Sequence, residues 1–363
     1  MRIEAVTTQL ARLPLLEGSW SDQIRNVSHI ETIVTDVVTD TGLVGTGFAY
    51  TSGIGGSTVR ALLETELAPF VAGKEVSPRG RWHEAWMHLH DMGGGGVSTM
   101  ALATIDIALW DLMAKQAGLP LVELLGRCRE RIPAYASGIN LQKSEDELLE
   151  QVRRWKADGY RAFKVKVGRP KIEEDLERLC RVKEITGRLP LMVDANQGWD
   201  FAKAARAMAA FEPLALHWVE EPLLSDDVEG HARLRRLVRT PIAIGETVYT
   251  LQQFKDYLSR GACDYLQADI VRVGGITPYL EIAALARAFG IPLAPHFVME
   301  LSGQVLCCLP NAHILEAIEG GSFSELNALV EPMPVVEGWF TPPSVPGHGI
   351  EFDRDYLKRY AVA

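Results

Sequence analysis

From Ile132 onward, the sequence alternates short apolar runs with amphipathic helical segments. One run with its helix spans about 25 residues, the size of one β/α unit. Eight runs predict an α/β fold with a closed barrel of parallel strands, and an open, doubly wound sheet is the alternative, because the repeat length alone does not show closure. The predicted strands are residues 134–137, 162–165, 191–193, 216–219, 242–244, 265–267, 293–295 and 314–315, with helices that include 145–155, 172–184, 201–211 and 279–289.

The chain before residue 126 has a different pattern. Residues 30–38 are rich in β-branched side chains, Asp40, Thr41 and Gly42 indicate a tight turn, and residues 43–48 return as a second strand. Residues 100–116 carry apolar side chains at helical spacing and predict a buried helix that stops before Gly118 and Pro120.

A tail rich in proline and glycine follows Glu319, where the repeat ends, and we expect it to pack on the first domain. The expected domains are residues 1–125, 126–321 and 322–363. With no long charged linker between them, they should form one rigid body.

Charge and cysteine content exclude several classes of protein. The formal net charge is -10 with no basic block, so a nucleic acid partner is not expected. The start of the chain, MRIEAVTTQL, has no basic segment followed by an apolar one, and no apolar run reaches the roughly 18 residues of a membrane span. We therefore expect a cytoplasmic protein that does not bind membranes. The five cysteines form no zinc-finger pair and have no nucleophile motif around them, which favours reduced core thiols over a cysteine nucleophile.

Three predicted strands end directly in carboxylates, namely Asp194 in LMVD, Glu220 in LHWVE and Glu246 after IAIG. In a parallel barrel these strand ends gather at one face, where the active sites of this architecture form. Three carboxylates there would repel one another unless a hard divalent cation bound between them, and oxygen ligands of this kind suit Mg²⁺. Any one of the three could be a solvated loop acid, but the repetition at successive strand ends favours a metal site.

Two lysines, Lys164 and Lys166 in FKVKVG, are spaced two residues apart on one predicted strand, so both side chains point to the same side. We expect both to enter the barrel mouth, where a neighbouring lysine and a cation would lower the pKa of at least one and make it a general base. An exposed strand with alternating lysines is the alternative, and it does not fit a parallel barrel that is buried on both faces.

Asp269 in YLQAD and His296 in LAPH fall at the ends of the sixth and seventh predicted strands, side by side. A carboxylate next to an imidazole fixes its tautomer and raises its basicity, which predicts a second proton carrier. Glu316, at the end of AHILE, would complete the ring and could hydrogen-bond a substrate carboxylate if protonated. Glu319, which lies close by, is the competing acid for this role.

The motifs KVKVG, VDANQGW, VEEP, IGET, QAD and APHF resemble the enolase superfamily, and within it the mandelate racemase group. The segment TIDIALWDLMAKQAGLPLVELLG is similar to the family's signature in the N-terminal capping domain, so the resemblance covers essentially the whole chain. LGRC replaces the more usual double glycine after this helix, at a peripheral position.

The resemblance implies a modified barrel of eight strands and seven helices, with an α+β capping domain made from both chain ends. It also implies roles for the charged residues at the barrel mouth. They are the Mg²⁺ ligands Asp194, Glu220 and Glu246, the base Lys166 with Lys164 beside it, a second base formed by His296 with Asp269, and Glu316 as the acid that binds the substrate carboxylate.

These residues predict Mg²⁺-dependent removal of the proton next to a carboxylate, because positive charge is needed where negative charge develops. We favour dehydration of an acid sugar, with racemisation, epimerisation or cycloisomerisation of a related hydroxy acid as the alternative. A non-catalytic sugar-acid binding protein is an alternative of another class. Candidate substrate contacts are Asn196, Trp20, Tyr50 and Met299, with Asp22 and Thr51 in the loops that would close over the mouth. The resemblance also makes a homo-oligomer, from dimer to octamer, the expected assembly.

Overall fold

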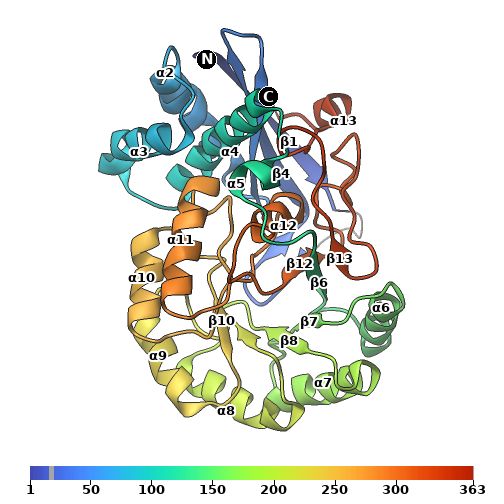
Figure 1. Ribbon diagram of the computed structural model, residues 1–363. Coiled ribbons are helices and arrows are strands. Elements are labelled where there is room, and N and C mark those ends of the chain that lie inside the picture. The colour runs from blue at the N-terminus through green and yellow to red at the C-terminus, as the bar shows by residue number, and fades with distance from the viewer. Residues whose placement is uncertain (16–19, 363) are drawn as a thin grey trace.

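The cap begins with a three-stranded antiparallel sheet in the order β1-β4-β5 (Figure 1). The computed structural model describes residues 1–15 and 20–362, and the sheet consists of β1 (Ile3–Pro14), β4 (His29–Thr39) and β5 (Val44–Thr51). The predicted hairpin is confirmed, with Gly42 in the turn at a φ of 81° that a side chain would disfavour. Between β1 and β4 lies a small antiparallel hairpin of β2 (Trp20–Ser21) and β3 (Asn26–Val27).

The helix α4 (Val97–Ala117) lies against this sheet and ends just before Gly118, which confirms the predicted buried helix and its stop. Gly45 and Gly47 on β5 allow the close approach: a Cβ at Gly47 would lie 1.7 Å from the carbonyl oxygen of Thr104. In the part of the chain that the structure describes, α4 alone is long and apolar enough to cross a membrane, yet 78% of its most apolar window is buried. Packing inside the protein therefore explains its composition.

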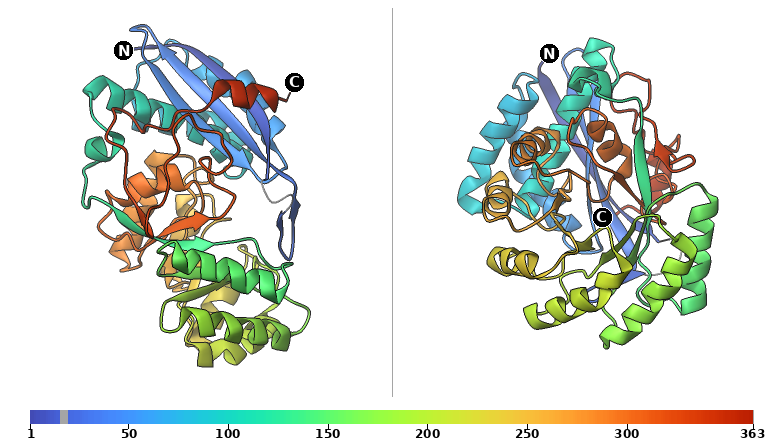
Figure 2. Two further views of the ribbon diagram at one scale, coloured as in Figure 1. Left: turned by 90° about the vertical axis from the view of Figure 1, so that its right-hand side faces the viewer. Right: turned by 60° about the horizontal axis from the view of Figure 1, so that its bottom comes forward.

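Short helices and the tail complete the cap. Val362 donates its backbone N–H to the carbonyl oxygen of Leu10 at 2.9 Å, so the end of the chain adds to β1, and both termini lie at the cap (Figure 2, left). The domain limits at residues 125 and 321 stay a prediction. The remaining cap and tail elements are α1 (Gly56–Leu62), η1 (Leu63–Leu67), α2 (Ala68–Val71), α3 (Pro78–Leu89), η2 (His90–Met92), α5 (Leu121–Leu125), β13 (Trp339–Phe340) and α13 (Arg354–Arg359).

Seven parallel strands curl into the barrel in the order β11-β10-β9-β8-β7-β6-β12, and β13 pairs with β6 from outside (Figure 2, right). Between the two ends of this order, Leu293 forms bridges to both Leu266 and Ala312. The predicted closed barrel is therefore confirmed over the open sheet. The strands are β6 (Ile132–Ser137), β7 (Phe163–Lys166), β8 (Leu191–Asp194), β9 (Val219–Glu220), β10 (Ile242–Ile244), β11 (Tyr265–Leu266) and β12 (Leu315–Ile318).

Three predicted strands differ most from the structure. The fourth, residues 216–219, shares only Val219 with β9, which ends at Glu220. The seventh, residues 293–295, is reduced to the single bridging residue Leu293, because Pro292 and Pro295 on either side cannot donate to a strand ladder. The eighth runs from Leu315 to Ile318 instead of ending at 315. The charge of Glu316 interrupts the apolar run there, although this side chain is buried inside the barrel.

Helices alternate with the barrel strands from β6 to β12, which gives seven helices among the described residues of this region. Capping boxes at Ser144 and Thr250 begin two of them. The cap and barrel are joined where Asp106 on α4 accepts the backbone N–H of Thr277 at 2.8 Å, in the first turn of α11. The helices are α6 (Glu145–Ala157), α7 (Ile172–Thr186), α8 (Phe201–Phe211) with η3 (Glu212–Leu214), α9 (Val228–Leu237), α10 (Leu251–Ser259), α11 (Ile276–Ala288) and α12 (Met299–Leu306).

Candidate active site at the barrel mouth

Three carboxylates converge where neighbouring barrel strands end. Asp194 and Glu220 are the last residues of β8 and β9 and face each other in the ladder, and Glu246 follows β10 by two residues. Each offers an oxygen within 4.8 Å of the other two, and all three are buried. The predicted cluster is confirmed, and buried carboxylate oxygens at this spacing fit a hard divalent cation.

Asn196 supports this cluster. Its backbone N–H and its side-chain amide donate to the two oxygens of Asp194, at 2.8 and 3.2 Å. We expected Asn196 to contact substrate, but its amide faces the carboxylate and it does not line the cavity at the barrel mouth. The structure therefore favours a role in orienting Asp194.

Two further side chains that the sequence analysis missed hold the other carboxylates. Gln267 donates its amide to Glu220 at 2.6 Å, and Arg272 donates to the Glu246 carboxylate at 3.2 Å and to its backbone carbonyl at 2.9 Å. Gln267 is the last residue of the predicted sixth strand and Arg272 follows it, in YLQADIVRVGG, but nothing in that segment marks which polar residue turns inward.

The two lysines of β7 point into the barrel, as their spacing predicts, and both are buried. The ammonium group of Lys164 donates to both oxygens of Glu220, at 2.7 and 2.8 Å, and lies 2.7 Å from Glu316. That of Lys166 donates to Asp194. Each lysine therefore touches one of the three clustered carboxylates.

The direction of the lysine pKa shifts is opposite to our expectation. Burial lowers the pKa of Lys166 and is the largest single effect, but the carboxylates of Asp194, Glu246 and Glu220 together raise it by more, and the net pKa lies above the usual value. Burial also lowers the pKa of Lys164, and Glu220 and Glu316 together hold it well above that value. The expected lowering relied on a cation as the nearest charge, whereas the nearest charges in this structure are carboxylates.

Glu316 lies inside the ring, as predicted, but as a carboxylate. Burial raises its pKa, but the positive charges of Lys164 and His296 together lower it by more, and the net pKa is about 2. The expected protonated acid is therefore not the form that this arrangement favours. The competing acid, Glu319, points away from the mouth and accepts from the indole N–H of Trp155 at 2.7 Å. The choice of Glu316 over Glu319 thus agrees with their positions.

His296 and Asp269 lie in contact across neighbouring strand ends. The Nδ1 atom of His296 is 2.8 Å from Oδ2 of Asp269, and its Nε2 atom is 3.5 Å from Glu246. The other oxygen of Asp269 accepts the backbone N–H groups of Val271 and Arg272 at 2.8 and 3.0 Å. Since Asp269 can only accept, Nδ1 carries the hydrogen and Nε2 faces the carboxylate cluster.

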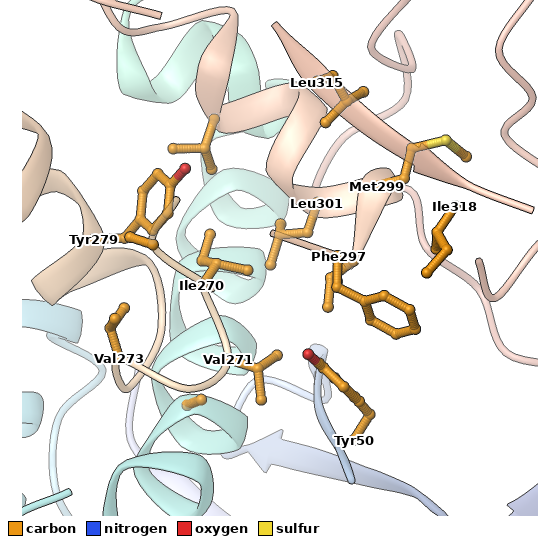
Figure 3. Close-up of a cluster of buried hydrophobic side chains, with 14 of the residues drawn as sticks. Tyr50, Ile270, Val271, Val273, Tyr279, Phe297, Met299, Leu301, Leu315 and Ile318 are labelled. Carbon is orange, nitrogen blue, oxygen red and sulfur yellow. The ribbon is translucent and has the colours of Figure 1, made fainter. Parts of the chain in front are cut away.

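Tyr50, at the end of β5 in the cap, completes this group. Its hydroxyl donates to the same Oδ2 of Asp269 and lies 3.4 Å from Nδ1 of His296. Its ring packs on Phe297 with the centroids 4.5 Å apart (Figure 3). We expected a substrate contact, and Tyr50 does line the cavity, but its hydroxyl donates its hydrogen bond to Asp269.

The cavity at the barrel mouth combines the lysines and the imidazole with residues of the cap. Trp20 and Asp22 line it, as expected, whereas Met299 lines a neighbouring cavity beside α6 and Thr51 donates to the buried Glu31 at 2.8 Å. The cavity is lined by Trp20, Asp22, Arg25, Val27, Tyr50, Ser52, Ile139, Lys164, Lys166, Glu246, Arg272, His296, Phe297, Glu316 and Ile318.

Arg25 was also missed by the sequence analysis. Its guanidinium is 3.3 Å from Asp22 and 3.6 Å from Glu246, so it connects the hairpin of the cap to the carboxylate cluster. At the end of β6, opposite Lys164, the hydroxyl of Ser137 is buried and has no hydrogen-bond partner among the residues that the structure describes.

The fold and this site define a barrel enzyme with a buried carboxylate triad suited to a divalent cation, flanked by a lysine and a histidine–aspartate pair. Residues 20–126 match the N-terminal domain of mandelate racemase and muconate lactonizing enzyme, and residues 147–356 match the enolase C-terminal domain-like family. The chain belongs to the mandelate racemase and muconate lactonizing enzyme family of the enolase superfamily.

Several named relatives are dehydratases or cycloisomerases of sugar acids. A 3,6-anhydro-α-L-galactonate cycloisomerase from Streptomyces coelicolor is 36% identical and covers 99% of both chains. An L-talarate/galactarate dehydratase from Salmonella typhimurium is 36% identical over 88% of this chain and 82% of its own. The structure of L-talarate dehydratase from Polaromonas sp. JS666, in complex with Mg and L-glucarate, has a TM-score of 0.90 at 35% identity and covers 100% of this chain and 98% of that one. The expected cofactor is thus bound in a solved relative, and the carboxylate triad for it is present here.

Proposed function

We propose that the protein removes the proton on the carbon next to the carboxylate of an acid sugar and then expels an oxygen from the neighbouring carbon. One observation carries this proposal: the carboxylate triad lies between Lys166 and the His296–Asp269 pair. Asp194, Glu220 and Glu246 would hold Mg²⁺, which supplies positive charge to the substrate carboxylate as negative charge develops on it.

Lys166 would act as a neutral amine that takes the proton from the carbon next to the carboxylate, because a cation bound by Asp194 would offset the negative charge that raises the pKa of this lysine. Lys164 keeps its positive charge through Glu316 and stands beside the developing dianion. The carboxylate triad, both lysines and the His296–Asp269 pair are buried, so the reaction proceeds away from bulk water, where these charges act most strongly.

His296 acts on the other side of the substrate. Its Nε2–H protonates the oxygen that leaves the neighbouring carbon, while Asp269 holds Nδ1 and stabilises the imidazolium before the proton is transferred. As the carbon–oxygen bond breaks, its electron pair goes to the leaving oxygen and a double bond forms between the two carbons. The resulting enol rearranges to a 2-keto acid.

The identity of the leaving oxygen separates the two candidate reactions. If it is a free hydroxyl, the product is a keto acid and one water, as in a dehydratase. If it is the ring oxygen of an anhydro sugar acid, the ring opens and the product is an isomer, as a cycloisomerase requires. We favour dehydration. The cycloisomerase from Streptomyces coelicolor, which matches over 99% of both chains, supports the second reaction.

A panel of aldonic, aldaric and anhydro sugar acids, incubated with protein and Mg²⁺ in heavy water, tests the proposal. We expect deuterium at the carbon next to the carboxylate in recovered substrate and at the neighbouring carbon in the 2-keto product, and mass spectrometry of the product distinguishes loss of water from isomerisation. If Mg²⁺ binds but no acid exchanges or reacts, the chain is a binding protein and the proposal is wrong. A homo-oligomer and a cytoplasmic location remain part of the proposal.

A further inference from the structure

The hairpin of β2 and β3 reaches from the cap sheet to the barrel (Figure 2, left). Its turn is closed by Asp22, whose backbone N–H donates to the carbonyl oxygen of Arg25 at 3.1 Å. The Asp22 carboxylate accepts the N–H groups of Ile24 and Arg25, both at 2.8 Å. Trp20, Asp22, Arg25 and Val27 of this hairpin line the cavity at the barrel mouth, so its position shapes that cavity.

Gln23, in the turn of the hairpin, joins it to the barrel. Its side-chain amide donates to the backbone carbonyl of Ala195 at 2.6 Å and to that of Val167 at 3.2 Å. These two residues directly follow Asp194 and Lys166 in the chain. A single side chain of the cap therefore bonds the backbone beside a metal ligand and beside the proposed base.

Two glycines make room for this amide. A Cβ at Gly168 would lie 2.0 Å from Cδ of Gln23, and a Cβ at Gly198 would lie 2.3 Å from the same atom. Gly168 has a φ of 127°, a backbone conformation that favours glycine whether or not Gln23 is present. Gly198 does not have a positive φ, and the three atoms that would lie nearest its Cβ all belong to Gln23. The space at Gly198 is thus needed for the Gln23 side chain.

We propose that Gln23 is a positioning residue that fastens the hairpin to the strand ends and thereby sets the closed shape of the substrate cavity. The consequence for substrate binding rests on the proposed function, whereas the attachment of the hairpin to the barrel through Gln23 does not. Arg25, two residues further on, lies 3.6 Å from Glu246, so the same fastening also places a guanidinium beside the carboxylate cluster. The hairpin contributes no proposed proton carrier, so loosening it should affect substrate affinity more than the chemical step.

Gln23→Ala and Gly198→Ala together test this role of Gln23. The first removes the amide, and the second places a methyl group in the space that the Gln23 side chain occupies. In hydrogen exchange without substrate, we expect the amides of residues 20–27 to exchange at least tenfold faster in each variant. With a substrate found as above, KM should rise about tenfold, as expected for the loss of two ordinary hydrogen bonds, while kcat changes less than threefold. The double variant should differ little from either single variant, since both disrupt one contact.

Gln23→Glu is the matched control for size, because it keeps the shape but presents oxygens to two carbonyls and should behave like Gln23→Ala. Wild-type exchange at residues 20–27 in Gln23→Ala overturns the proposal, whether or not any substrate is known. If Gly198→Ala does not fold, hydrogen exchange in Gln23→Ala and Gln23→Glu still tests the proposal. If exchange quickens but KM stays within twofold of wild type, the role in shaping the cavity is wrong.

Discussion

The hydroxyl of Tyr50 donates to the same oxygen of Asp269 that contacts His296, so a cap residue is part of the proton-carrying group of the barrel. The two partners are 219 residues apart in sequence. Docking of the cap is therefore required not only to enclose substrate but also to complete the hydrogen bonds that hold the imidazole.

Replacing Tyr50 with phenylalanine should separate removal of the proton by Lys166 from departure of the oxygen, which depends on His296. Phenylalanine keeps the packing on Phe297 but removes one of the donors to Asp269, so His296 is held less firmly. We expect product formation to fall about tenfold, a fraction of what a general acid contributes, while deuterium exchange through Lys166 continues. Equal loss of exchange and product would contradict a role through His296.

The proposed base and acid can be distinguished in the same assay. Lys166→Ala should lower both exchange and turnover by about 10²–10⁴-fold, the usual contribution of a general base. His296→Asn should abolish product formation but retain exchange, because the lysine remains. Lys255→Ala, at an exposed position on α10, is the matched control and should react like wild type. Full turnover by Lys166→Ala would remove that lysine from the mechanism.

Magnesium should stabilise the fold through the carboxylate triad. A ligand that binds only the folded state at 100 times its Kd adds about 2.7 kcal/mol, which a thermal unfolding scan after chelator treatment and Mg²⁺ addition can measure. Asp194→Asn should lose this increase, because the carboxylate ligand becomes a neutral amide. Asp146→Asn, on the exposed face of α6, should retain it. A stabilisation by Mg²⁺ that survives Asp194→Asn would place the ion elsewhere.

The contact between α4 and α11 should depend on pH through Asp106. Burial raises the pKa of this carboxyl from 3.8 to about 7, although the hydroxyl and N–H of Thr277 partly oppose the shift. The raised pKa means that the folded state holds the proton more tightly than the unfolded state. Its contribution is therefore full below pH 3.8 and is lost as the pH rises to about 7, by roughly 4 kcal/mol at most.

Asp106→Asn removes this titration and leaves the other acids of the protein unchanged. Urea unfolding of both proteins at pH 4.5 and pH 8 gives the comparison, and the variant should gain stability relative to wild type between the two values. The same stability difference at both pH values would show that Asp106 does not titrate in this range.

Local patterns in the sequence determined the barrel, its helices and the identity of most charged residues at its mouth. Lys164 and Lys166 share a face because strand side chains alternate, and Asp194 and Glu220 end neighbouring runs. These inferences need only the periodicity of one element and the rule that parallel strands end on one face. The same reasoning predicted a seventh strand at residues 293–295, which the structure reduces to the bridging residue Leu293, because proline removes the donors that a ladder requires.

Only the tertiary structure decided which side chains meet across the two domains. Tyr50 and Gln23 reach partners that no spacing in the sequence relates to them, since their contacts depend on how the cap docks on the barrel. The direction of the lysine pKa shifts also required coordinates, because burial and nearby carboxylates act in opposite directions and their balance depends on distance. Electrostatic and hydrogen-bonding partners are set by proximity in space, which the order of residues along the chain does not contain.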